Sequence, residues 1–131
     1  MVTKRILVVC THNSARSQIA EAYLRRFLGE RAEVHSAGTN PTGIHPLAQA
    51  VMQEVGYDLS THSSDSIQKY LGQQWDYVIT VCDHAKETCP YVPAKSHIHV
   101  SFPDPSRGDI ETFRQVRDAI RIWAASFAES I

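Results

Sequence analysis

An apolar run, a short polar loop and an amphipathic helix follow one another near the start of the chain, and this succession constrains the fold most. Residues 5–10 are mainly Ile, Leu and Val, as expected of a strand covered on both faces of a parallel sheet. Beyond the loop, apolar residues recur at helical spacing, namely Ile19, Ala20, Tyr23, Leu24, Phe27 and Leu28. Gly29 can end this helix in a left-handed conformation, so the chain begins as strand, loop and helix.

The alternation of strand and helix continues along the rest of the chain. Residues 33–37 predict a second strand, and a helix that begins at Pro46 is closed by Gly56. The other expected elements are a short helix over residues 64–71, strands over residues 76–81 and 97–102, and a last helix with Asp109 as its N-cap. This order predicts an α/β fold, a three-layer sandwich in which a four-stranded parallel sheet is flanked by helices.

The length and charge of the chain exclude several classes of protein. With 131 residues, 43% of them apolar and 21% charged, the chain suits a single globular domain over residues 1–131. A formal net charge of -1 gives no electrostatic reason to expect nucleic acid or a membrane as a partner. The first apolar run is too short for a signal peptide or a membrane span. We therefore expect a cytoplasmic protein.

The loop "CTHNSARS" (residues 10–17) carries the pattern Cys-x5-Arg-Ser between a buried strand and a helix N-terminus. Amides in a loop that curls into a helix point towards one centre and have no partner within the helix. They predict a cradle for a tetrahedral oxyanion, to which Arg16 adds a bidentate guanidinium. The expected oxyanion-binding residues are Thr11, His12, Asn13, Ser14, Ala15, Arg16 and Ser17.

Cys10 stands at the end of the strand, beneath the expected oxyanion. The positive field of Arg16 and the loop amides is expected to lower the pKa of Cys10, and the Ser17 hydroxyl to donate to its sulfur. Cys10 would then be a nucleophilic thiolate. The alternative is a small buried residue that completes an apolar strand. The position of the motif between a parallel strand and a helix favours the nucleophile.

Three separated motifs resemble one family of known proteins. "CTHNSARSQIAEAYL" followed by "HSAGTNPTGIHPLA" resembles the low-molecular-weight tyrosine phosphatases, and the likeness covers nearly the whole chain. Within that fold the sequence is most similar to the thioredoxin-coupled arsenate reductases, because "VCDHAKETCP" supplies Cys82 and Cys89 and "FPDPSRG" supplies Asp104. Family loops often read Cys-x-Gly-Asn-x-Cys-Arg, where this chain has His12 and Ala15.

The resemblance implies a reaction and assigns roles to these residues. Cys10 would attack arsenate, Asp104 would act as general acid, and Cys82 and Cys89 would form a redox pair. The reaction would be reduction of arsenate to arsenite in arsenic detoxification. Electrons would come from thioredoxin or glutaredoxin, no cofactor would be required, and the protein would be a monomer.

Other interpretations of these residues remain open from the sequence. Cys82 follows the third expected strand, at the carboxyl end where parallel α/β sheets place their sites. One alternative is that Cys82 is a small buried residue and Cys89 a surface thiol. Another is that both are zinc ligands, although Cys-x6-Cys lacks the spacing of common zinc motifs. If residues 82–89 are helical, their end Cα atoms lie roughly 10 Å apart, so a disulfide requires unwinding. Asp104 is otherwise an ordinary turn residue.

A structural potassium ion is also implied by the resemblance. Asn13, Glu21, Ser36 and Asp65 match positions that bind potassium in some similar reductases, and oxygen ligands suit a hard cation. The alternative is that Asn13 bonds the loop amides while Glu21 and Asp65 are solvated surface carboxylates.

Two other functions compete with arsenate reduction. A low-molecular-weight protein tyrosine phosphatase would hydrolyse phosphate monoesters through a phosphocysteine, using the same loop and acid but neither Cys82 nor Cys89. An oxyanion-sensing module would use the fold without turnover. The presence of Cys10, Arg16 and Asp104 together argues against the sensor.

Overall fold

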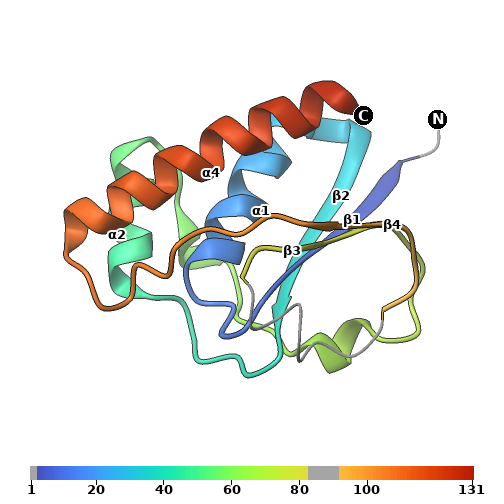
Figure 1. Cartoon of the computed structure of the whole chain (residues 1–131), viewed down its shortest axis with the longest axis horizontal. Helices are drawn as coiled ribbons and strands as arrows, with labels where there is room; N and C mark the ends of the chain where they lie inside the picture. The colour runs from blue at the N-terminus through green and yellow to red at the C-terminus, as the bar shows by residue number, and fades with distance from the viewer. Residues whose placement is uncertain (1–2, 83–91) are drawn as a thin grey trace.

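A four-stranded parallel sheet forms the centre of the molecule in a computed structural model that describes residues 3–82 and 92–131 (Figure 1). The spatial order is β2-β1-β3-β4, formed by β1 (Lys4–Cys10), β2 (Ala32–Gly38), β3 (Trp75–Thr80) and β4 (Ala94–His99). Each neighbouring pair of strands is parallel. The predicted α/β fold with a four-stranded parallel sheet is therefore confirmed.

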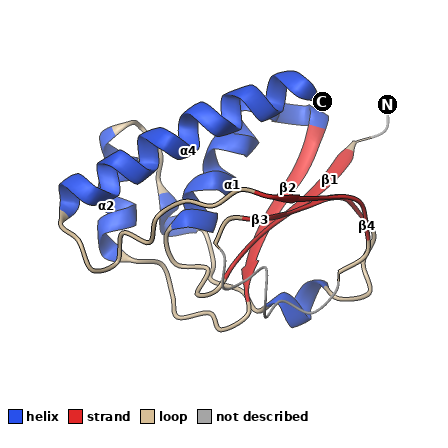
Figure 2. Cartoon of the chain, in the orientation of Figure 1, coloured by secondary structure: helices blue, strands red, loops and turns tan. Residues whose placement is uncertain are grey.

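Helices cover the sheet and join its strands. Figure 2 shows α1 (Arg16–Leu28), α2 (Pro46–Glu54) and α4 (Ile110–Ser130) on one side of the sheet, with the 3-10 helix η3 (Ile67–Tyr70) on the other. Two further 3-10 turns are η1 (Gly29–Arg31) and η2 (Leu59–Thr61). Among the helices of the described residues, none is both long and apolar enough to cross a membrane.

The core forms around β1, which has a hydrogen-bonded neighbour on each side. Its residues Ile6, Leu7, Val8 and Val9 have no exposed surface, as expected of a central parallel strand covered on both faces. The apolar stripes of α1 and α4 supply buried partners, among them Ile19, Leu24, Phe113 and Ile120. The carboxyl end of β1, and the loop that follows it, are thereby held on a rigid base.

The last strand begins earlier than the sequence predicts. β4 runs from Ala94 to His99 rather than over residues 97–102. β4 lies at one edge of the sheet, and its residue Ala94 pairs with Trp75 of β3. The pairing with β3, rather than an apolar pattern within β4, sets where the strand begins. Residues 64–71 also differ from the expected helix, because they contain only the single 3-10 helix η3.

Glu54 at the end of α2 joins that helix to α4. Its carboxylate accepts hydrogen bonds from Arg114 Nη2 at 2.6 Å and from Arg117 Nη1 at 2.8 Å. Hydrogen bonds from Arg114, and then from Arg117, lower the pKa of Glu54 from 4.5 to about 2. At the start of α4, the Asp109 side chain accepts from Thr112 N at 3.1 Å, which confirms the predicted N-cap of this helix.

Gly38 ends β2 directly beneath the loop formed by residues 10–17, which we call the anion loop. A Cβ atom at Gly38 would lie 2.6 Å from Thr11 O and 2.9 Å from Asn13 N, both backbone atoms. Only glycine allows the strand to approach the anion loop this closely. The shape of the loop is thus tied to the end of β2.

We expect Glu54→Gln to lower the free energy of unfolding at neutral pH, measured by urea denaturation. The folded-state pKa is lowered, so the stabilisation is present above the ordinary value of 4.5 and is lost as the pH falls towards about 2. The difference between wild type and variant should shrink over that range. Glu111→Gln is the matched control, because Glu111 pairs with Arg114 of its own helix at 3.2 Å and so does not join α4 to α2. Equal losses in both variants, or a loss independent of pH, would contradict this role.

We expect Gly38→Ala to displace the anion loop, at a cost of about 1–3 kcal/mol for overpacking, and to weaken binding of a tetrahedral oxyanion. Thermal unfolding and calorimetry with inorganic phosphate measure the two effects. Gly72→Ala is the control, since Gly72 has φ +86° but no atom near its Cβ position. The control should lose stability while keeping its phosphate affinity. Wild-type phosphate affinity in Gly38→Ala would show that the loop does not depend on this contact.

Candidate active site

The anion loop is anchored from outside through its carbonyl groups. Thr11 O accepts from Asn40 N at 2.8 Å, His12 O from Thr42 N at 3.1 Å and Ser14 O from His45 N at 3.0 Å. In a planar trans peptide the N–H points away from the C=O. The amides that follow these three carbonyls therefore point away from the anchoring segment.

Asn13 lies at the centre of the loop and is fully buried. Its φ of 48° is in the left-handed region, which asparagine tolerates better than most residues. Ser17 Oγ donates to Asn13 Oδ1 at 2.8 Å, and Gln18 Nε2 donates to Asn13 O at 3.1 Å. The expected bond from Ser17 to the Cys10 sulfur is therefore wrong, because Asn13 takes the hydroxyl. Gln18 was not predicted, although it directly follows the motif.

Two cysteine thiols meet beneath the loop. Cys10 Sγ donates to Cys82 Sγ at 3.3 Å, and both residues are buried, with 3% and 2% of their surface exposed. Thr11 Oγ1 also lies 3.3 Å from Cys82 Sγ. The strands β1 and β3 are parallel neighbours, so their carboxyl ends bring the two cysteines together. Cys89 lies outside the described residues.

The protonation of Cys10 differs from the sequence expectation. The hydrogen bond with Cys82, and then burial, raise the pKa of Cys10 above its ordinary value, while Arg16 acts to lower it. Arg16 acts on the pKa of Cys10 in the expected direction, but the prediction that this pKa is lowered overall is wrong. The reason is that Cys82 and the buried surroundings come from parts of the chain distant in sequence from the motif.

Arg16 connects the anion loop to the segment that carries Asp104. Its Nη1 donates to Phe102 O at 3.1 Å, and its Nη2 lies 3.9 Å from Asp104 Oδ2. The Asp104 side chain is 52% exposed and accepts from Ser106 N at 3.0 Å. Burial acts to raise the pKa of Asp104, but the bonds from Ser106 and the charge of Arg16 hold it below its ordinary value.

A small pocket joins these groups at the carboxyl edge of the sheet, and we call it the anion pocket. Its walls are formed by Cys10, His12, Ser14, Ala15, Arg16, His45, Asp104 and Ser106. The structure thus brings the predicted nucleophile, guanidinium and acid around one space. His45 and Ser106 were not predicted from the sequence, where His45 stood only as the residue before Pro46.

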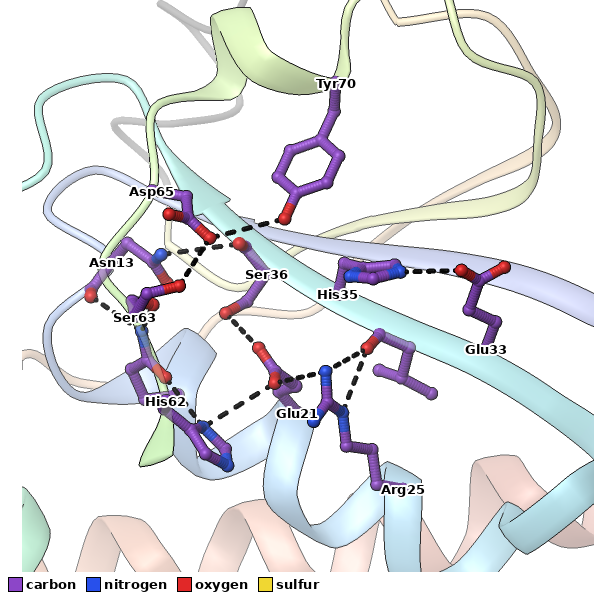
Figure 3. A network of polar contacts seen from close by, with 12 residues as sticks. Asn13, Glu21, Arg25, Glu33, His35, Ser36, His62, Ser63, Asp65 and Tyr70 are labelled. Atoms are coloured by element: carbon purple, nitrogen blue, oxygen red, sulfur yellow. Dashed lines mark hydrogen bonds and ion pairs between the residues drawn. The ribbon is translucent and has the colours of Figure 1, made fainter. Parts of the chain in front are cut away.

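The expected potassium ligands lie in a polar network beside the anion loop (Figure 3). Asn13 Nδ2 donates to Ser36 O at 3.4 Å, and Ser36 Oγ donates to Glu21 Oε1 at 2.5 Å. Asp65 borders the same cavity as Glu21 and Ser36 and accepts from Ser63 Oγ at 2.8 Å. Three of the four residues are thus in direct contact, and the fourth lies beside them.

The chemistry of this network fits a hard cation. The side chains of Glu21, Ser36 and Asp65 offer carboxylate and hydroxyl oxygens, which potassium prefers, whereas Asn13 Oδ1 already accepts from Ser17 Oγ. Glu21 is only 7% exposed and pairs with Arg25 at 2.9 Å, so its interpretation as a solvated surface carboxylate is wrong. A bound cation would share this carboxylate with Arg25. Within residues 3–82 and 92–131, no three His, Cys, Asp or Glu side chains gather as a metal site.

Comparison with known proteins agrees with the fold. An arsenate reductase of Halalkalibacterium halodurans is 39% identical over 99% of each chain. An arsenate reductase of Staphylococcus saprophyticus is 42% identical over 92% of each chain. A solved arsenate reductase in a phosphate-binding state is 29% identical, with a TM-score of 0.86 over 98% of this chain and 99% of that one.

The family assignment rests on almost the entire chain. The model of the family described as low molecular weight phosphotyrosine protein phosphatase matches residues 5–131. That range contains all of β2, β3, β4 and the helices, together with the anion loop and Asp104. The chain therefore belongs to the low molecular weight phosphotyrosine protein phosphatase family.

Proposed function

We propose that this protein is an arsenate reductase that converts arsenate to arsenite through Cys10, Cys82 and Cys89, with thioredoxin as reductant. The observation that carries the proposal is the 3.3 Å contact between Cys10 Sγ and Cys82 Sγ. A hydrolytic phosphatase has no use for a second thiol at this position. The relatives named arsenate reductase, at 39% and 42% identity, support the same choice.

The first step is attack of Cys10 Sγ on arsenic, as the Cys10 thiol proton passes to an oxygen of the bound arsenate. A sulfur–arsenic bond forms, and one arsenic–oxygen bond breaks. The loop amides and Arg16 hold the remaining oxygens, and Asp104 protonates the departing one. A bound oxyanion competes for Arg16 and adds negative charge near Asp104, and both effects raise the pKa of that carboxyl. The acid is thereby protonated more readily when substrate is present.

The second step transfers two electrons to arsenic. The Cys82 thiolate attacks Cys10 Sγ, a disulfide forms, and the electron pair of the sulfur–arsenic bond stays on arsenic. Arsenic(V) becomes arsenic(III) and departs as arsenite. The two sulfurs are separated by 3.3 Å, and a disulfide bond is about 2.05 Å long. A movement of little more than an ångström therefore closes the bond.

The third step regenerates the nucleophile. The Cys89 thiolate attacks Cys82 Sγ and expels the Cys10 thiolate, so the disulfide moves from the anion pocket to the pair Cys82 and Cys89. The dithiol of thioredoxin then reduces this pair, and its own cysteines are oxidised. Cys89 lies in the segment outside the described residues, so this step depends on the sequence and on the resemblance to the reductases.

Hydrolysis of phosphate monoesters is the second candidate, favoured by the match to a phosphatase family. The anion loop, Arg16 and Asp104 would serve a phosphocysteine intermediate equally well, because the first step of both reactions is attack on a tetrahedral oxyanion. The two functions separate at Cys82. A reductase requires this thiol, and a phosphatase does not.

The test is arsenate-dependent oxidation of NADPH in the presence of thioredoxin and thioredoxin reductase. We expect turnover there, slower turnover with a glutaredoxin system, and weak hydrolysis of an aryl phosphate. Cys82→Ser should release no arsenite yet keep the aryl phosphate hydrolysis. Cys89→Ser should release one arsenite per chain and stop with Cys10 bonded to Cys82, which peptide mass spectrometry detects. Cys10→Ser should lose both activities.

Two results would overturn the proposal. Rapid aryl phosphate hydrolysis without arsenate reduction would make the chain a phosphatase. Multiple turnovers by Cys89→Ser with thioredoxin would show that the disulfide is reduced without the third cysteine.

We also propose that Asn13, Glu21, Ser36 and Asp65 bind potassium and so stabilise the anion loop. Potassium chloride should raise the midpoint of thermal unfolding above that in choline chloride at equal ionic strength. Glu21→Gln should remove the difference. Glu33→Gln is the control, because Glu33 borders the same cavity but pairs with Arg5 and His35. Equal midpoints of the wild type in the two salts would contradict the site.

A further inference from the structure

His45 lines the anion pocket, and the reaction steps above give it no role. Its backbone N–H donates to Ser14 O at 3.0 Å, so the residue is fastened directly to the anion loop. Its ring lies against Phe113, with the ring centroids 4.7 Å apart. Phe113 is fully buried. The position of His45 is therefore fixed by its backbone hydrogen bond and by the packing of its ring against Phe113.

The contact of His45 with α2 sets which ring nitrogen accepts a hydrogen bond. His45 is the N-cap of that helix, and its Nδ1 accepts from Leu47 N at 3.1 Å. A ring nitrogen that accepts an N–H cannot itself donate, so Nε2 is the His45 ring nitrogen that can donate a hydrogen bond.

We infer that His45 is an additional oxyanion-binding residue, which donates from Nε2 to an unprotonated oxygen of the anion beside Cys10 and Arg16. The same pocket is lined by Cys10, Ser14, Arg16 and Asp104, so an anion held there lies beside His45 as well. The chemical class of ligand is a tetrahedral oxyanion. That the oxyanion is arsenate rests on the proposed function.

Two conservative variants separate this role from helix capping. In His45→Asn the amide replaces Nδ1 and can still cap α2, but nothing replaces Nε2. In His45→Gln the longer side chain reaches the Nε2 position, but it is a poor cap. We therefore expect His45→Asn to lower anion affinity but not stability, and His45→Gln to lower stability but not anion affinity.

The experiment measures the Kd for inorganic phosphate by calorimetry and the midpoint of thermal unfolding, in wild type and both variants. Phosphate is used because it undergoes no reduction. His45→Asn should keep the midpoint and bind phosphate about tenfold more weakly, as expected for loss of a hydrogen bond to a charged group. His45→Gln should lower the midpoint and keep most of the affinity. The arsenate KM should follow the same order.

Asp109→Ala is the matched control, because it removes the cap of α4 and Asp109 does not border the anion pocket. It shows how much affinity is lost through instability alone. An affinity loss in His45→Asn no larger than in Asp109→Ala would overturn the inference and leave His45 as a helix cap. Failure of the proposed function looks different, because the wild type would bind phosphate and yet reduce no arsenate.

Discussion

Parallel pairing of β1 with its two neighbours is the constraint on which the site depends. Because parallel strands end at the same edge of a sheet, β3 places Cys82 against Cys10 at the end of β1. On the other side of β1, β2 ends at Gly38 against the backbone of the anion loop. The position of the thiol pair and the approach of β2 to the loop therefore both arise from one sheet register.

The electrostatics of the site come mainly from backbone groups and a single side chain. Backbone amides of the anion loop supply positive potential without any ionised residue, and the first turn of α1 adds to it. Arg16 is the charged member, and it contacts both Phe102 O and Asp104. One guanidinium thus links the anion pocket to the segment between β4 and α4. The site can therefore attract an anion although the formal net charge of the chain is -1.

The sequence predicted what depends on local pattern and missed what depends on distant neighbours. The apolar run of residues 5–10 and the Asp109 cap were predicted correctly, because each is encoded within a few residues. The start of β4 was placed three residues too late, since an edge strand has a weak apolar pattern. The pKa of Cys10 was predicted to be lowered, because the motif contains Arg16 but neither Cys82 nor the surrounding core. His45 carries no local signal beyond its place before Pro46.

The outward anchoring of the anion loop bears on how sequences of this fold diverge. Its carbonyls are held by the backbone amides of Asn40, Thr42 and His45, and a backbone amide is the same in every residue except proline. Drift at Asn40 and Thr42 therefore leaves the anchoring donors in place, and a new proline there would remove one. Selection at these two positions should act on the presence of an N–H rather than on side-chain identity. The segment can vary between relatives while the geometry of the loop is inherited unchanged.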